Sequence, residues 1–163
     1  MFLAHANEFT PGKANCQTIE ILYLTMADVL SKEQRHKCMS RIRSKDTKPE
    51  VLVRRFLFAH GFRYRLHRKD LPGKPDIVLP KYKTVIFING CFWHGHSNCK
   101  YAALPETNRD FWETKISGNV ERDKATYAKL INMGWRVIEL WQCQLKPKTK
   151  EKTLNNLITE LQQ

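Results

Sequence analysis

The clearest helical pattern in the chain is TKPEVLVRRFLFAHG, which precedes two short apolar runs. Thr47 and Glu50 have the T-x-x-E spacing of a capping box, in which each side chain accepts a hydrogen bond from the backbone N–H of the other residue. Proline is tolerated in a first helical turn, as at Pro49, and Gly61 can end the helix. We therefore predict a helix here, preceded by a polar, helix-permissive segment at Ser31–Arg43.

Strand patterns follow directly. FRYRL, Phe62–Leu66, alternates apolar and basic residues as a half-exposed strand does. DIVLP at Asp76–Pro80 and TVIFING at Thr84–Gly90 are short β-branched runs separated by three residues. They predict an antiparallel hairpin whose second strand is buried on both faces.

The C-terminal half returns to alternating helix and strand patterns. Asn119–Met133 has apolar residues at helical spacing and stops at Gly134. WRVIELW, Trp135–Trp141, predicts a further strand, and Thr153–Leu161 a last amphipathic helix. This order of elements favours an α/β sandwich with a central mixed β-sheet.

The length of 163 residues suits one domain. Residues 1–25 lack a helical or strand period and the features of a signal peptide, so we interpret them as an extension or a misassigned start, with one domain at 26–163. No apolar run approaches the ~20 residues of a membrane helix. The five cysteines are an odd number, which argues against a disulfide framework and favours a cytoplasmic protein.

The charge balance indicates a polyanionic partner. The chain has 28 Lys+Arg against 16 Asp+Glu, a net charge of +12, and the basic residues are spread along most of it. A membrane-surface helix would gather them on one face opposite an apolar one, and no segment does so. Nucleic acid is therefore the favoured partner, although a merely soluble basic surface is the alternative.

The loop GCFWHGHSNC carries the chemistry of a metal site. Cys91, His96 and Cys99 lie within nine residues, and Cys143 can supply a fourth ligand if the two strand ends are neighbours. Thiolates and imidazole suit structural zinc. The alternative is that the cysteines are small buried hydrophobes. A Cys3His site leaves His94 spare, as a general acid or base or as a plain surface histidine.

Three segments, LPGKPDIVLPKYKTVIFINGCFWHGH, NRDFWETKISGNVERD and GWRVIELWQC, resemble the very short patch repair (Vsr) endonucleases. The resemblance runs from about Met26 to Cys143. It implies the restriction-endonuclease-like fold, a three-layer sandwich with a PD-(D/E)xK core. It also implies a Mg²⁺-dependent nick on the 5′ side of a thymine mispaired with guanine in double-stranded DNA.

The resemblance also assigns an active site. It implies that Asp76 holds Mg²⁺ together with the backbone carbonyl of Ile88, because the facing strand VIFING lacks the second acidic residue. His94 resembles the catalytic histidine, and Asp123 the carboxylate that orients it. Asp123 also lies on an otherwise apolar helical stripe, where buried carboxylates usually have a partner; the alternative is a solvated charge at the stripe's edge.

The sequence leaves the roles of two further positions open. Glu50 resembles a residue near the family's active site, but its capping role explains it equally well. Asn89 stands where family members often carry a second active-site histidine. Asparagine cannot accept or deliver a proton at neutral pH, which leaves His94 as the main acid–base candidate.

Phe92 and Trp93 lie between the metal ligands, and Trp112 resembles a third aromatic of the family's DNA-inserting wedge. Rigid apolar side chains can be driven between base steps to kink DNA, and a mismatch unstacks at lower cost. Core packing is the alternative for these three rings. Zinc ligation would stiffen the loop that presents them.

We therefore expect a monomeric, zinc-stabilised, Mg²⁺-dependent mismatch endonuclease with no membrane association. Two alternatives remain at this stage. One is a non-catalytic DNA-binding module that uses zinc and aromatics to recognise damage. The other is a nickase of the same fold that acts on a different target.

Overall fold

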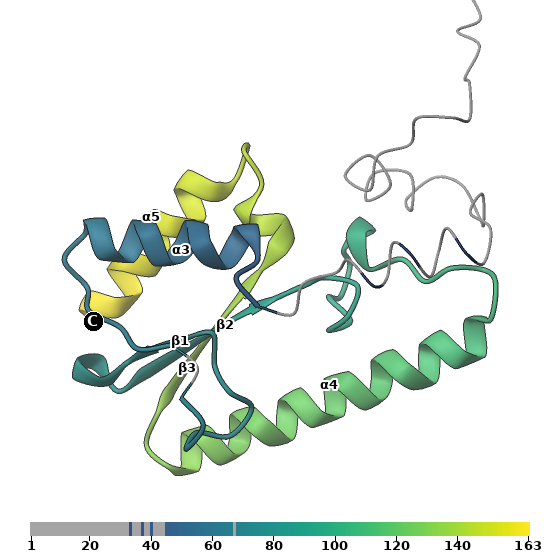
Figure 1. The fold of residues 1–163 in the computed structure, drawn as a ribbon, viewed down its shortest axis with the longest axis horizontal. Coiled ribbons are helices and arrows are strands. Elements are labelled where there is room, and N and C mark those ends of the chain that lie inside the picture. The colour runs from purple at the N-terminus through teal and green to yellow at the C-terminus, as the bar shows by residue number, and fades with distance from the viewer. Residues whose placement is uncertain (1–32, 34–36, 38–39, 41–44, 67) are drawn as a thin grey trace, which may run out of the picture. The chain divides into compact units, whose positions relative to one another are not determined.

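The computed structural model describes residues 33, 37, 40, 45–66 and 68–163. Residues 1–25 and nearly all of the helix expected at Ser31–Arg43 lie outside the described residues. The elements described below belong to one compact unit, Ile42–Gln163. They are labelled as in Figure 1.

Helix α3, Lys48–Ala59, confirms the helix predicted from the capping pattern. The Thr47 side chain accepts a hydrogen bond from the backbone N–H of Glu50 at 3.5 Å. The Glu50 carboxylate returns to the backbone N–H of Asp46 at 3.0 Å, one residue before the position that a standard capping box uses. Gly61 has φ +83° and ends the helix, as its lack of a side chain allows.

The sheet has three strands in the order β1-β2-β3. β1, Ile77–Leu79, pairs antiparallel with β2, Thr84–Asn89, in the predicted hairpin. β2 also pairs in parallel with β3, Arg136–Trp141, so the sheet is mixed as predicted. The central β2 is buried at every residue except the partly exposed Ile88, which confirms a strand covered on both faces.

The strand expected at Phe62–Leu66 was wrong. The segment makes one bridge, in which Arg65 exchanges two backbone hydrogen bonds with Val78 at 2.8 and 2.9 Å. Its partner β1 is only three residues long and is followed by Pro80, which has no backbone N–H. A longer ladder therefore has nothing to pair with on this edge.

Apolar side chains from the sheet form a separate cluster on each face. Ile77, Ile86 and Leu140 point toward α3 and the C-terminal helix α5, Lys150–Gln162. Val78, Val85 and Phe87 point the other way, toward Leu130 of α4, Arg109–Asn132. In Figure 1, α3 and α5 accordingly lie on one side of the sheet and α4 on the other. The alternation follows from the two-residue period of a strand.

Two helices are longer than their hydrophobic pattern indicated. α4 begins at Arg109 rather than near Asn119, and its first half is mostly exposed, with Ile116 its buried residue. An exposed helical half lacks the apolar period from which helices are predicted, so the pattern found only the packed part. α5 likewise extends beyond Thr153–Leu161 at both ends. Among the described residues, no helix is both long and apolar enough to span a bilayer.

Candidate functional site

The candidate residues gather where β2 and β3 end. Because these strands are parallel and in register from Thr84–Arg136 to Asn89–Trp141, their carboxyl ends meet at one edge of the sheet. The loop from Gly90 to Cys99 leaves this edge after β2, and Cys143 follows β3. Two segments that are far apart in the sequence therefore meet here.

Asp76 lies just before β1 and is bound to the neighbouring strand, because its Oδ2 accepts a hydrogen bond from the Ile88 N–H at 2.8 Å. Burial raises the pKa of Asp76 to about 6. The Ile88 bond lowers that pKa and the charge of Glu50 raises it, while Arg54 and His94 lower it. Asp76 is thus in electrostatic contact with both the α3 charges and the loop histidine.

The backbone N–H of Ile88, not its carbonyl, is the group that contacts Asp76. No contact of the described residues bears on the carbonyl as a metal ligand, so that role stays a prediction. The bond nevertheless fixes the two proposed ligands to each other. It holds the carboxylate of Asp76 against the end of β2.

His94 and Asp123 form the pair that the sequence predicted. The imidazole Nδ1 lies 2.6 Å from Asp123 Oδ2, and both side chains are partly exposed. With Nδ1 bound to the carboxylate, Nε2 remains for a ligand. The loop approaches α4 closely here: a side chain at Gly95, which has φ +61°, would lie 2.8 Å from Val120. The small residue at this position therefore lets His94 reach Asp123.

Glu50 has the capping contacts that its sequence predicted, and its part in an active site stays a prediction. It is buried, accepts hydrogen bonds at the start of α3, and its charge also acts on Asp76. Its carboxylate is bound at 2.8 Å by Arg54, which is itself buried and also pairs with Asp46. Sequence reasoning missed Arg54, although a Glu and an Arg four residues apart on one helix were the available signal.

Asn89 is a fixed hydrogen-bond donor. Its Nδ2 donates to Glu139 Oε1 at 2.6 Å and to the Tyr127 hydroxyl at 2.9 Å, and that hydroxyl donates to Glu139 at 3.1 Å. The three residues come from β2, β3 and α4. Burial raises the pKa of Tyr127, which stays a neutral phenol. Tyr127 and Glu139 were not predicted as site residues; Tyr127 lies one helical turn after Asp123.

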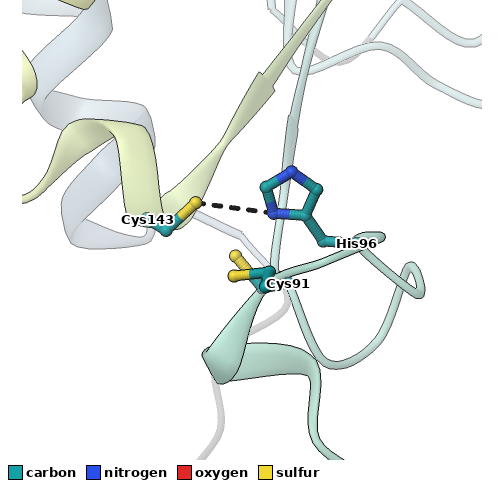
Figure 2. Close-up of side chains that lie close together, drawn as sticks. Cys91, His96 and Cys143 are labelled. Atoms are coloured by element: carbon teal, nitrogen blue, oxygen red, sulfur yellow. Dashed lines mark hydrogen bonds between the residues drawn. The ribbon is translucent and has the colours of Figure 1, made fainter.

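Cys91, His96, Cys99 and Cys143 lie together, with their ligand atoms all within 4.8 Å of one another. His96 Nδ1 is 3.4 Å from Cys143 Sγ, and Figure 2 shows these two side chains facing each other with Cys91 beside them. Four ligands of a tetrahedral zinc lie roughly 3.5–3.8 Å apart, as bond lengths of about 2.0–2.3 Å require. The cluster therefore fits one metal ion with little movement.

The surroundings of Cys91 and His96 both bear on metal binding. Burial raises the pKa of Cys91 to about 12, so this thiol is protonated at neutral pH and would lose its proton only on binding a cation. The His96 ring stacks on Trp141 at 4.0 Å with an interplanar angle of 4°, which fixes its orientation. The buried-hydrophobe alternative explains Cys91 but not the convergence of all four side chains.

The aromatic residues of the loop form a cluster with the start of α4. Phe92 and Trp93 contact each other edge to face at 5.2 Å, and Trp112 lies 5.3 and 6.0 Å from them. Phe111 extends the cluster and is 58% exposed. None of these rings belongs to the two core clusters of the described chain. The core-packing alternative therefore does not account for them.

Comparison with known proteins gives consistent matches. The sequence profile of the family "DNA mismatch endonuclease Vsr" matches residues 27–100. The type II nicking enzyme V.NmeAIP of Neisseria meningitidis serogroup A is 51% identical over 137 residues, which is 83% of this chain and 97% of that protein. V.XorIIP of Xanthomonas oryzae pv. oryzae is 51% identical over 120 residues, 74% and 88% of the two chains. The DNA mismatch endonuclease Vsr of Escherichia coli K12 is 41% identical over 135 residues, 83% and 85%.

The buried ion pair of α3 gives a stability prediction. Arg54→Met leaves Glu50 buried without its cation, so the free energy of unfolding in urea should fall by about 3 kcal/mol or more. The control is Arg109→Met, whose pair with Glu113 is 53% and 52% exposed and should contribute little to stability. Equal stability of the two variants would contradict the assignment.

Proposed function

Because the chain belongs to the Vsr family and is a DNA endonuclease, we propose that it nicks one strand of double-stranded DNA on the 5′ side of the thymine in a T:G mismatch. The observation that carries the proposal is the convergence of Asp76 with the His94–Asp123 pair at one edge of the sheet. The mismatch target is supported by the name of the Escherichia coli relative.

The proposed architecture is the restriction-endonuclease-like three-layer sandwich. Its support is the apolar cluster on each face of the mixed sheet, with α3 and α5 on one side and α4 on the other. In this arrangement the carboxyl ends of parallel strands present catalytic groups at one edge. Asn89 ends β2 at this edge, and Asp76, which immediately precedes the antiparallel β1, lies at the same edge.

Asp76 and the Ile88 carbonyl are the proposed ligands of Mg²⁺, a hard cation that prefers oxygen. Both residues are already fixed by the bond between the Asp76 carboxylate and the Ile88 N–H. When bound, the cation would neutralise charge on the phosphate and activate water. Glu50 adds a second buried carboxylate near Asp76, and Arg54 compensates its charge.

His94 is the proposed general acid–base group. Its Nδ1 is held by Asp123, which fixes the ring and leaves Nε2 to move a proton. Asn89 does not transfer a proton; both of its amide hydrogens are used in bonds to Glu139 and Tyr127. We propose that Asn89 instead holds β2, β3 and α4 in place around the site.

Cys91, His96, Cys99 and Cys143 are the proposed ligands of a structural zinc ion, which the Cys3His donor set suits. The ion would hold the loop rigid. Phe92, Trp93 and Trp112 then form the proposed wedge that enters the mismatched base step. The lysines and arginines that give the chain its net charge of +12 are the proposed phosphate contacts. The protein is proposed to act as a monomer.

A second candidate function is a nick at another target. Several relatives carry the name type II nicking enzyme, which specifies no mismatch. Asn89 also departs from the histidine expected of the family. The nicking rate at T:G is therefore compared with the nicking rate at every other mismatch. A non-catalytic binding module has no support from these relatives.

The zinc proposal predicts about one zinc ion per chain in protein purified without chelators. Cys91→Ala and Cys143→Ala should each lose the ion and unfold more easily, because metal binding contributes directly to folding. Cys16→Ala, which removes a cysteine that is not among the four proposed ligands, is the matched control and should keep its zinc. Elemental analysis of the folded protein that finds no metal would refute this assignment.

Strand-specific nicking of duplexes that carry each mismatch, with Mg²⁺, tests the function itself. T:G should be nicked fastest, 5′ of the thymine. Asp76→Asn keeps the side chain's shape but removes the charge that holds the cation, so nicking should fall by orders of magnitude while mismatch binding persists. Parental nicking by this variant would show that Asp76 does not hold the metal. Fastest nicking at another site would favour the second candidate function.

Trp93→Ala should have the opposite effect. The metal residues stay intact, but the preference for T:G over a matched duplex should shrink by about tenfold, because stacking is worth about 1–3 kcal/mol per aromatic. Binding without Mg²⁺ and single-turnover nicking with it are measured on the same duplexes. Phe58→Ala, an exposed phenylalanine on α3, is the control. An unchanged preference in Trp93→Ala would exclude the wedge role of this residue.

A further inference from the structure

Two lysines share one tyrosine ring beside the metal cluster. The ammonium groups of Lys100 and Lys146 each lie 5.3 Å from the centroid of the Tyr101 ring. Lys100 directly follows the cluster residue Cys99, and Lys146 comes shortly after Cys143. We call Lys100, Tyr101 and Lys146 the lysine clasp. It is joined through the backbone to two of the four cluster residues.

The backbone of the lysine clasp is held in place. The N–H of Ala102 donates to the carbonyl of Cys99 at 2.9 Å, which forms the short turn that carries Lys100 and Tyr101. The N–H groups of Thr149 and Lys150 donate to the Lys146 carbonyl at 3.0 and 2.9 Å. These bonds hold the backbone from which each lysine side chain extends, and the ring contact orients the two ammonium groups.

Neither lysine has an acidic partner in the described part of the chain. The ion pairs of the described residues involve arginines and one histidine as the basic partners. Neither Lys100 nor Lys146 takes part in one. The nearby Glu106 lies 3.6 Å from Arg109 instead. Two like charges near the same ring repel each other, and negative charge bound beside either one reduces this repulsion.

A comparison within the protein shows that the clasp is distinctive. Lys81 and Lys83 also lie on aromatic rings, 5.7 Å from Tyr82 and 5.2 Å from Trp135, but each has a separate ring. They lie before β2, at the end of the sheet away from the candidate catalytic residues. The lysine clasp follows the ends of β2 and β3, which is the edge with Asp76 and His94.

We propose that the lysine clasp is a binding site for the phosphate backbone of the DNA duplex. The ligand follows from the chemistry: two ammonium donors without acidic partners bind a polyanion, and they are presented beside the loop that carries Phe92 and Trp93. The proposal rests on the proposed function for the identity of the polyanion. The clasp contacts the backbone and so positions the duplex without reading its sequence.

The salt dependence of DNA binding tests the site. Lys100→Gln/Lys146→Gln is compared with Lys81→Gln/Lys83→Gln, which removes the same charge from lysines on other rings. Affinity for a perfectly matched duplex is measured by fluorescence anisotropy, without Mg²⁺, between about 50 and 200 mM salt. The plot of log affinity against log salt should lose about 1–2 units of slope in the clasp variant, since each phosphate contact contributes about 0.9. The control should keep the parental slope.

An unchanged slope in the clasp variant, or an equal change in the two variants, overturns the proposal, since either shows that only overall charge matters. Lys100→Arg/Lys146→Arg keeps both charges and should keep the slope. Because binding is measured on matched DNA without Mg²⁺, the result does not depend on nicking or on mismatch choice. Failure of the proposed function is therefore seen separately, in the nicking assay.

The tyrosine is tested by a variant that keeps every charge. Tyr101→Leu removes the ring on which the two lysines lie and should weaken duplex binding severalfold, whereas Tyr101→Phe keeps the ring and should bind as the parent does. Metal content and thermal unfolding are measured to show that each variant is folded. Parental affinity in the leucine variant would show that the ring does not position the lysines.

Discussion

The parallel pairing of β2 with β3 is the constraint on which the rest of the site depends. In register, it brings the end of β2 at Asn89 beside the end of β3 at Trp141, although about fifty residues separate them in sequence. A parallel pair needs a long crossover, and α4 provides it while covering the second face of the sheet. The same helix then supplies Asp123 to the loop histidine.

The loop after β2 is held by several independent contacts. Its cysteines and His96 meet Cys143 from beyond β3, and Asn119 of α4 donates to the Trp93 carbonyl at 2.9 Å. A loop of polar and aromatic residues has little core of its own, so such contacts decide its conformation. They explain how large rings can remain outside the core and still keep a defined arrangement.

Buried charge is the cost of this arrangement. Water is largely excluded from Asp76, Glu50 and Arg54. This burial raises the pKa of Asp76 to about 6. A hydrophobic set of residues at these positions would serve stability better. Under the proposed function, the two carboxylates near this one buried arginine would hold a further cation. Structure that is unfavourable for folding alone is common where proteins bind ligands.

Sequence alone was sufficient for features that depend on neighbours in the chain. The cap of α3, the β1–β2 hairpin and the closely spaced cysteines and histidine were predicted because local spacing fixes them. The motif resemblance likewise indicated the family. Only tertiary structure decided which groups from distant segments meet: Asn89 with Tyr127 and Glu139, and two lysines on Tyr101. It also reduced the expected strand at Phe62–Leu66 to one bridge. These outcomes depend on contacts between distant segments, which a local pattern does not encode. The same polar residue is stable in solvent or in a buried hydrogen-bond network, and what packs against it decides between the two.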